Sequence, residues 1–185
     1  MDDSKIIDLF FERSEQAIEE LSTKYESVCR AIATNILSNS LDAEECVNDT
    51  FLAVWNTIPP TVPLSLKGYV CGIVRKLSIS KYHTNSAQKR NSNYDIALDE
   101  LEACLASPVT VEDEIAVKEL SRMLNNFLST LDKDSRVIFV RRYWYSDSIA
   151  DIAKRQKISR NNTSVRLTRI REKLKQYLKK EGYWI

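Results

Sequence analysis

The segment at residues 147–180 combines two stripes of apolar residues that are separated by a turn. The first stripe has the i, i+3, i+4 spacing of one helix face and consists of Ile149, Ile152 and Ala153. Ile158 then lies in the turn, and Ser159 is a favourable N-cap for a second helix. The inward face of this second helix repeats at spacings of four and three residues, through Thr163, Leu167, Ile170, Leu174 and Tyr177. The segment therefore predicts two helices joined by a tight turn.

The outward face of the second predicted helix is polar and strongly basic. Its side chains are suited to phosphates and base edges, and a helix of this width fits the major groove of DNA. The residues predicted to contact DNA are Arg160, Asn161, Asn162, Ser164, Val165, Arg166, Thr168, Arg169 and Arg171. The alternative is a solvated basic helix in an all-helical bundle. The turn, the cap and the short preceding helix together favour the DNA-binding interpretation.

Charge is divided along the chain into four blocks of alternating sign, although the net charge is only +1. Residues 1–57 carry 4 basic and 12 acidic side chains, and residues 58–91 carry 6 basic and no acidic ones. Residues 92–135 carry 3 basic and 10 acidic side chains, and residues 136–185 carry 14 basic and 4 acidic ones. Two basic blocks separated by an acidic one suggest two nucleic-acid contacts that are joined by a linker. The acidic N-terminal block indicates a different, basic partner.

Helical periodicity covers most of the remaining chain. The clearest amphipathic pattern places apolar residues at relative positions 0, 3, 4, 7, 8 and 11, namely Leu120, Met123, Leu124, Phe127, Leu128 and Leu131. Glycine and proline are scarce, with 3 and 4 residues, and no strand-like alternation is visible. We therefore expect an all-α protein with two small helical domains, at residues 10–90 and 112–182, joined by an acidic linker at residues 91–111.

Helix boundaries in the first domain are also indicated by the sequence. Asp42 and Glu45 resemble a capping box that opens a helix, and Leu52 lies on the apolar stripe of that helix. The proline-rich stretch at residues 58–63 must interrupt it, because proline removes a backbone donor. Ser65 is then expected to cap the next helix.

Several classes of function are disfavoured by the sequence. No apolar run approaches the ~20 residues that cross a bilayer, and the acidic N-terminus is unlike a signal peptide, so we expect a cytoplasmic protein without membrane insertion. The four cysteines lack CxxC spacing and the single histidine is His83, so we expect no metal or other cofactor. The sequence shows no paired carboxylates near a histidine, no nucleophile motif and no glycine-rich phosphate loop, so we do not expect an enzyme.

Two motifs resemble the sigma-70 family of bacterial RNA polymerase sigma factors, specifically the small two-domain extracytoplasmic-function type. Residues 42–55, DAEECVNDTFLAVW, resemble the core-binding signature of sigma domain two. Residues 131–174 resemble sigma domain four, which contains a helix-turn-helix. The spacing typical of domain four is carried by Arg141-Arg142-Tyr143, Ile152-Ala153, Ile158-Ser159 and Arg166-Leu167. Both motifs occur in the order that the family has.

The resemblance implies a role for each charge block. The acidic surface of domain two would dock on a coiled coil of the largest polymerase subunit, through Glu44, Glu45, Asn48 and Asp49. The first basic block, at residues 58–91, would recognise and melt the −10 promoter element, because it offers positive charge and flat side chains to a single DNA strand. The implied −10 residues are Arg75, Lys76, Ser80, Lys81, Tyr82 and His83. The helix after Ser159 would read the −35 element as duplex.

The predicted function is therefore promoter-specific transcription initiation: the protein would bind core RNA polymerase and recognise promoter DNA, as duplex at −35 and as single strand at −10. The resemblance further implies an anti-sigma protein as a partner. The alternative is a helix-turn-helix regulator that binds duplex DNA as a dimer without polymerase. A third interpretation, an all-helical protein adaptor, predicts no salt-dependent DNA affinity, which the two basic blocks disfavour.

Overall fold

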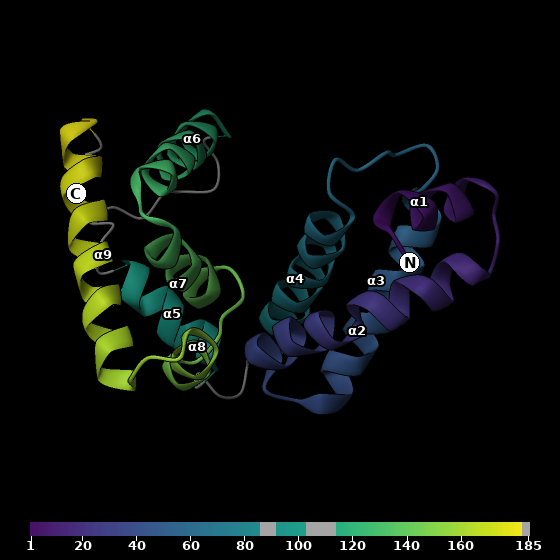
Figure 1. The fold of residues 1–185 in the computed structure, drawn as a ribbon, viewed down its shortest axis with the longest axis horizontal. Helices are drawn as coiled ribbons and strands as arrows, with labels where there is room; N and C mark the ends of the chain where they lie inside the picture. The colour runs from purple at the N-terminus through teal and green to yellow at the C-terminus, as the bar shows by residue number, and fades with distance from the viewer. Residues whose placement is uncertain (86–91, 103–113, 183–185) are drawn as a thin grey trace. The chain divides into compact units, whose positions relative to one another are not determined.

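The computed structural model describes residues 1–85, 92–102 and 114–182. Within these residues the chain forms nine helices and no strand, so the predicted all-α fold is confirmed (Figure 1). The chain divides into two compact units, Met1–Ser92 and Asn93–Ile185. None of the described helices combines the length and the apolar character that crossing a membrane requires.

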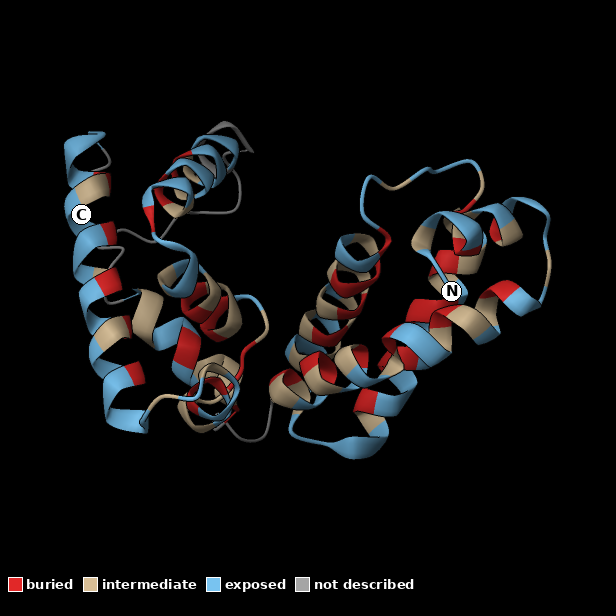
Figure 2. Cartoon of the chain, in the orientation of Figure 1, coloured by how far each residue is buried: buried red, intermediate tan, exposed pale blue. Residues whose placement is uncertain are grey.

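The first unit contains four helices: α1 (Asp3–Phe11), α2 (Gln16–Leu37), α3 (Ser40–Thr57) and α4 (Leu66–Asn85). Helices α2, α3 and α4 pack against one another in pairs, and α1 packs on α2. Each helix contributes buried apolar side chains, among them Phe10, Leu21, Val47 and Val74. Figure 2 shows buried residues in red along these helices. The unit therefore has a hydrophobic core of its own.

Helix α3 begins earlier than the sequence predicted. Its N-cap is Asn39, whose Oδ1 accepts hydrogen bonds from the backbone N–H groups of Leu41 at 2.9 Å and Asp42 at 3.4 Å. The predicted capping box of Asp42 and Glu45 is not formed, because both residues already lie inside the helix and their carboxylates pair with α4. Leu52 also differs from its prediction, since 57% of it is exposed.

The proline-rich stretch separates α3 from α4, as the sequence predicted. Helix α3 ends at Thr57 and α4 begins at Leu66. The Ser65 hydroxyl accepts a hydrogen bond from the backbone N–H of Gly68 at 3.1 Å, which confirms Ser65 as the cap of α4.

The second unit contains five helices: α5 (Asn93–Glu102), α6 (Glu114–Thr130), α7 (Lys133–Tyr143), α8 (Ile149–Gln156) and α9 (Arg160–Lys180). Helix α9 packs against α6, α7 and α8, and α5 packs against α7. The predicted inward face of α9 is confirmed, because Leu167, Ile170 and Leu174 are buried. Asp132 caps α7 by accepting from the backbone N–H of Ser135 at 2.9 Å, and this bond lowers the pKa of the Asp132 carboxyl.

The interval that we predicted as an acidic linker contains α5, which belongs to the second unit. Ala97 is buried, and Leu101 packs against the core of that unit. These two residues are four apart and share one helix face, but the surrounding acidic side chains dominate the sequence pattern and conceal the short stripe. The rest of the predicted linker, residues 91 and 103–111, lies outside the described residues.

Candidate DNA-binding and polymerase-binding surfaces

Helices α8 and α9 form a helix-turn-helix. Lys157 ends α8 with a left-handed backbone, at a φ of 54°, and Ile158 packs against the core of the unit. Serine side chains cap both helices: Ser148 accepts from the backbone N–H of Asp151, and Ser159 from that of Asn162, each at 3.1 Å. Helix α9 therefore occupies the place of the helix that enters the major groove in this motif.

The beginning of α9 presents most of the predicted DNA-contacting side chains to solvent. The exposed ones are Arg160, Asn161, Asn162, Ser164, Val165, Thr168 and Arg169. Thr163 and Leu167 between them are buried, so the opposite face anchors the helix. Arg166 is half-buried, and its Nε donates a hydrogen bond to Asn162 Oδ1 at 3.0 Å. Two of the predicted contact residues are therefore coupled to each other.

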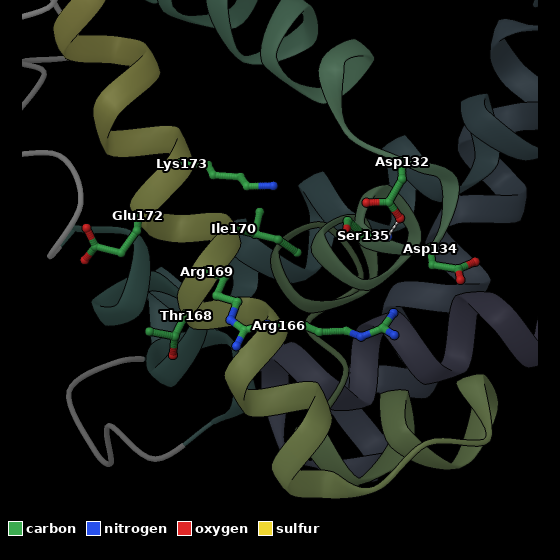
Figure 3. Close-up of a pocket in the computed structure, with 9 residues that line it drawn as sticks. All are labelled: Asp132, Asp134, Ser135, Arg166, Thr168, Arg169, Ile170, Glu172 and Lys173. Carbon is green, nitrogen blue, oxygen red and sulfur yellow. Dashed lines mark hydrogen bonds between the residues drawn. The ribbon is translucent and has the colours of Figure 1, made fainter.

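A hollow of about 550 Å³ lies between α9 and the start of α7. Arg166, Arg169 and Lys173 line its α9 side, and Asp132 and Asp134 lie across from them (Figure 3). Lys173 was missed in the sequence-based set of contact residues. Its position, seven residues after Arg166, was the available signal, because residues at i and i+7 lie on one helix face. The basic edge of α9 therefore extends at least to Lys173.

Arg171 is half-buried and does not join the exposed set, and its predicted contact with DNA stays a prediction. Its Nη1 donates to Glu100 Oε2 at 3.2 Å and to the Tyr143 hydroxyl at 3.0 Å. The reason is helical geometry: Arg171 lies four residues after Leu167 and three before Leu174, on the stripe that packs inward. Burial of the Tyr143 side chain raises the pKa of its hydroxyl to about 12.

Helix α3 places the predicted core-binding residues together on its solvent side. Glu44, Glu45, Asn48 and Asp49 are all exposed. Leu41 and Leu52, which are 76% and 57% exposed, share one face with Glu45 and Asn48, since the four residues follow at spacings of four, three and four. The acidic patch is therefore bordered by an apolar side chain at each end, a feature that sequence reasoning missed.

The predicted core-binding and −10 residues meet at one point of the first unit. Lys81 of α4 pairs with Glu45 at 2.5 Å and with Asp42 at 3.5 Å. The hydrogen bond from Lys81 to Glu45 raises the pKa of Lys81. Asn85 Nδ2 adds a hydrogen bond to Asp42 Oδ2 at 3.1 Å. Lys81 is therefore held at the acidic patch of α3.

The other predicted −10 residues divide into two groups along α4. Lys76, Ser80 and His83 are exposed and follow at spacings of four and three, so they share one face. Arg75 and Tyr82 are half-buried, and the ring of Tyr82 packs edge-on against His83 with centroids 5.7 Å apart. The exposed face of α4 is thus polar, with one cation and one imidazole.

Two family models match this chain. The model of sigma-70 region 2 matches residues 21–88, and the model of sigma-70 region 4 matches residues 121–174. The chain belongs to the sigma-70 family. Region 2 followed by region 4 is typical of sigma factors of the extracytoplasmic-function type, so the resemblance seen in the sequence is confirmed.

Eight chains among the solved structures match this sigma factor. One of them is CnrH, solved in complex with the cytosolic domain of CnrY; it is 19% identical, with 96% of this chain and 97% of that chain covered and a TM-score of 0.45. No curated protein sequence matches the chain.

The two matched regions of the sigma factor contain the surfaces described above. Region 2 includes the acidic patch of α3 and the exposed face of α4, and region 4 includes the helix-turn-helix. Helix α5 lies between the two matches.

The described cysteines of the sigma factor, Cys29, Cys46 and Cys71, are buried. Burial raises the pKa of Cys29 to about 12 and also raises that of Cys46. Buried thiols of raised pKa are inert as nucleophiles and metal ligands. In the part of the chain that the structure describes, no group of histidine, cysteine and carboxylate side chains could hold a metal ion.

Proposed function

We propose that this sigma factor docks on core RNA polymerase through the exposed face of α3, reads the −35 element with the beginning of α9 and opens the −10 element with the exposed face of α4. One observation carries the docking step: four polar and acidic residues, Glu44, Glu45, Asn48 and Asp49, are exposed side by side inside the region 2 match. An exposed acidic patch contributes little to folding, because exposed charges stabilise a fold only weakly. Leu41 and Leu52 add apolar area at its edges.

The docking proposal is tested by binding of the purified protein to sigma-free core polymerase. Wild type should bind tightly, and Asp49→Lys should bind at least about tenfold more weakly, because like charges opposed across an interface repel. Asp8→Lys makes the same charge reversal on α1, outside the region 2 match, and should bind like wild type. If wild type itself did not bind, the helix-turn-helix regulator would be the better description, and paired half-sites in duplex DNA would be the next search.

For the promoter, the proposal assigns duplex recognition to α9 and strand opening to α4. Its support is chemical: α9 exposes hydrogen-bonding side chains on a helix anchored by its other face, and α4 exposes Lys76 and His83. In this scheme the sigma factor neither forms nor breaks a covalent bond. It supplies binding energy that polymerase uses for opening the duplex.

We also infer an anti-sigma partner and a cytoplasmic location, both from membership of the family. A tagged sigma factor recovered from its own cells before induction should bring down one protein that is not a polymerase subunit, and this protein should be lost after induction. Recovery of the sigma factor with polymerase under both conditions would count against the partner.

A further inference from the structure

A single carboxylate of α5 is bonded to three side chains of two other helices. Glu100 accepts two hydrogen bonds from Arg142, from Nε at 3.1 Å and from Nη2 at 2.8 Å. It also accepts from the Tyr143 hydroxyl at 3.1 Å and from Arg171 Nη1 at 3.2 Å. The negative charge of Glu100 is therefore shared by two guanidinium groups, one on α7 and one on α9.

The arginine of α7 depends on this carboxylate. Only 3% of the Arg142 side chain is exposed, and a guanidinium removed from water needs a counter-charge with good hydrogen-bond geometry. Arg142 also donates from Nη1 to the backbone carbonyl of Asp147 at 3.0 Å. Asp147 is buried in the turn that precedes α8, and its carboxylate pairs with Arg141. Glu100 therefore acts through Arg142 on the turn that begins the helix-turn-helix.

Arg171 connects α9, the second helix of the helix-turn-helix, to the same carboxylate of Glu100. Arg171 lies two residues after Arg169, the last of the exposed predicted DNA contacts, and points toward α5 and α7. Glu100 thereby links α5 to both helices of the motif: to α8 through the turn and to α9 directly. Helix α5 nevertheless lies outside the region 4 match, which begins at residue 121.

We propose that Glu100 is a positioning residue for −35 recognition, and that α5 is a working part of the DNA-reading unit. This inference rests on the proposed function of α9. The neutral substitution Glu100→Gln would keep the shape of the side chain but remove the charge that holds the two guanidiniums. The angle between α8 and α9 would then be less well defined, so specific contacts would suffer more than general attraction to phosphate.

The test measures the affinity of the full-length protein for two duplexes. One is a −35 sequence selected by wild type from a random library, and the other is an unrelated duplex of equal length. Glu100→Gln should lose about tenfold or more in affinity for the selected duplex and little for the unrelated one. Asp99→Asn removes the same charge from an exposed neighbour on α5 and should behave like wild type. If the substitution only lowered the amount of folded protein, the apparent affinity would fall by the same factor for both duplexes.

A double-mutant cycle separates positioning from direct contact. If Glu100 acts through Arg171, the combination of Glu100→Gln with Arg171→Gln should bind little worse than Arg171→Gln does. Losses that multiply in this cycle and also in the corresponding cycle with Arg142→Gln would overturn the inference, because Glu100 would then act through neither arginine. Unchanged affinity in Glu100→Gln would overturn it too. Tighter binding by Glu100→Gln would overturn it as well, because Glu100 would then be competing with phosphate for Arg171. If Glu100→Gln lowers the helical circular dichroism at the assay temperature, Glu100→Asp replaces it, with the same expected direction.

The outcome for wild type distinguishes this inference from the function on which it rests. A wild-type protein that selects no sequence from the library would contradict −35 recognition itself. A wild-type protein that selects a sequence, together with a Glu100→Gln variant of equal specificity, would contradict only the role of Glu100.

Discussion

The orientation of Asn162 on α9 is fixed by Arg166, one turn later in the helix. The Nε of Arg166 donates a hydrogen bond to Asn162 Oδ1 at 3.0 Å, and this bond orients the side-chain amide of Asn162. The sequence placed Arg166 and Arg169 in one set of predicted DNA contacts, without a distinction between them. The hydrogen bond separates them, because Arg166 is coupled to a candidate base-reading side chain and Arg169 is exposed.

We therefore expect three alanine variants to differ in whether they change the sequence preference, the general affinity for DNA, or both. Asn162→Ala should change the −35 consensus, because a good side chain-to-base contact contributes about 1–3 kcal/mol of discrimination. Arg169→Ala should weaken binding to all duplexes alike and reduce the salt dependence by roughly one ion. Arg166→Ala should do both, since it also releases Asn162. Selection on randomised −35 DNA measures the consensus, and a salt titration measures the ion count. The same consensus from Asn162→Ala and wild type would mean that another face of α9 reads the bases.

At the scale of elements, the contact between α3 and α4 changes an expectation about Lys81. The resemblance placed Lys76 and Lys81 together among the implied −10 residues, which melt the promoter. Lys81, however, is paired with Glu45 of the acidic patch and with Asp42 next to it on α3, whereas Lys76 is exposed on α4.

Lys81→Ala should consequently alter the affinity for core polymerase, and Lys76→Ala should not. Loss of the ammonium group leaves Glu45 and Asp42 without that counter-charge, so both the charge and the side-chain positions of the docking face change. Permanganate reactivity of promoter thymines should fall in Lys76→Ala at saturating polymerase, because a cation on the strand-binding face is lost. Equal core affinity for both variants and wild type would show that the α3 patch does not need Lys81.

Elements also show where sequence reasoning succeeds and where it stops. Long stripes, such as that of α9, are predicted correctly, because many residues repeat the same period. Helix α5 has a stripe of two residues inside an acidic block, so only its tertiary contacts show that it packs into the second unit. The cap of α3 was misplaced because Asn39 and Asp42 are both good N-cap residues: Asn39 takes the cap, and Asp42 lies in the first turn and pairs with Lys81 of α4. Arg171 was assigned to DNA by its charge; its position on the helix turns its side chain toward Glu100 and Tyr143.

For the molecule as a whole, each unit has its own core, with residues such as Leu21 in the first and Leu174 in the second fully buried. We expect two separable unfolding transitions in calorimetry. Leu21→Ala should destabilise only one of them and Leu174→Ala only the other, each by about 2–5 kcal/mol, because a large apolar side chain is removed from a packed core. Leu52→Ala, at an exposed site, should shift neither by more than about 0.5 kcal/mol. Transitions that moved together in every variant would instead show a single cooperative molecule.

The sharing of Glu100 between two arginines has a consequence for exchanging promoter specificity among sigma factors. A chimera joined at the border of the region 4 match, residue 121, would receive Arg142 and Arg171 from one parent and whatever stands at position 100 from the other. One joined ahead of Asn93 would carry the two cations together with the anion that balances them. We therefore expect a segment exchanged between sigma factors to keep its specificity only when it begins at or before Asn93, so that the charges of Arg142 and Arg171 stay compensated.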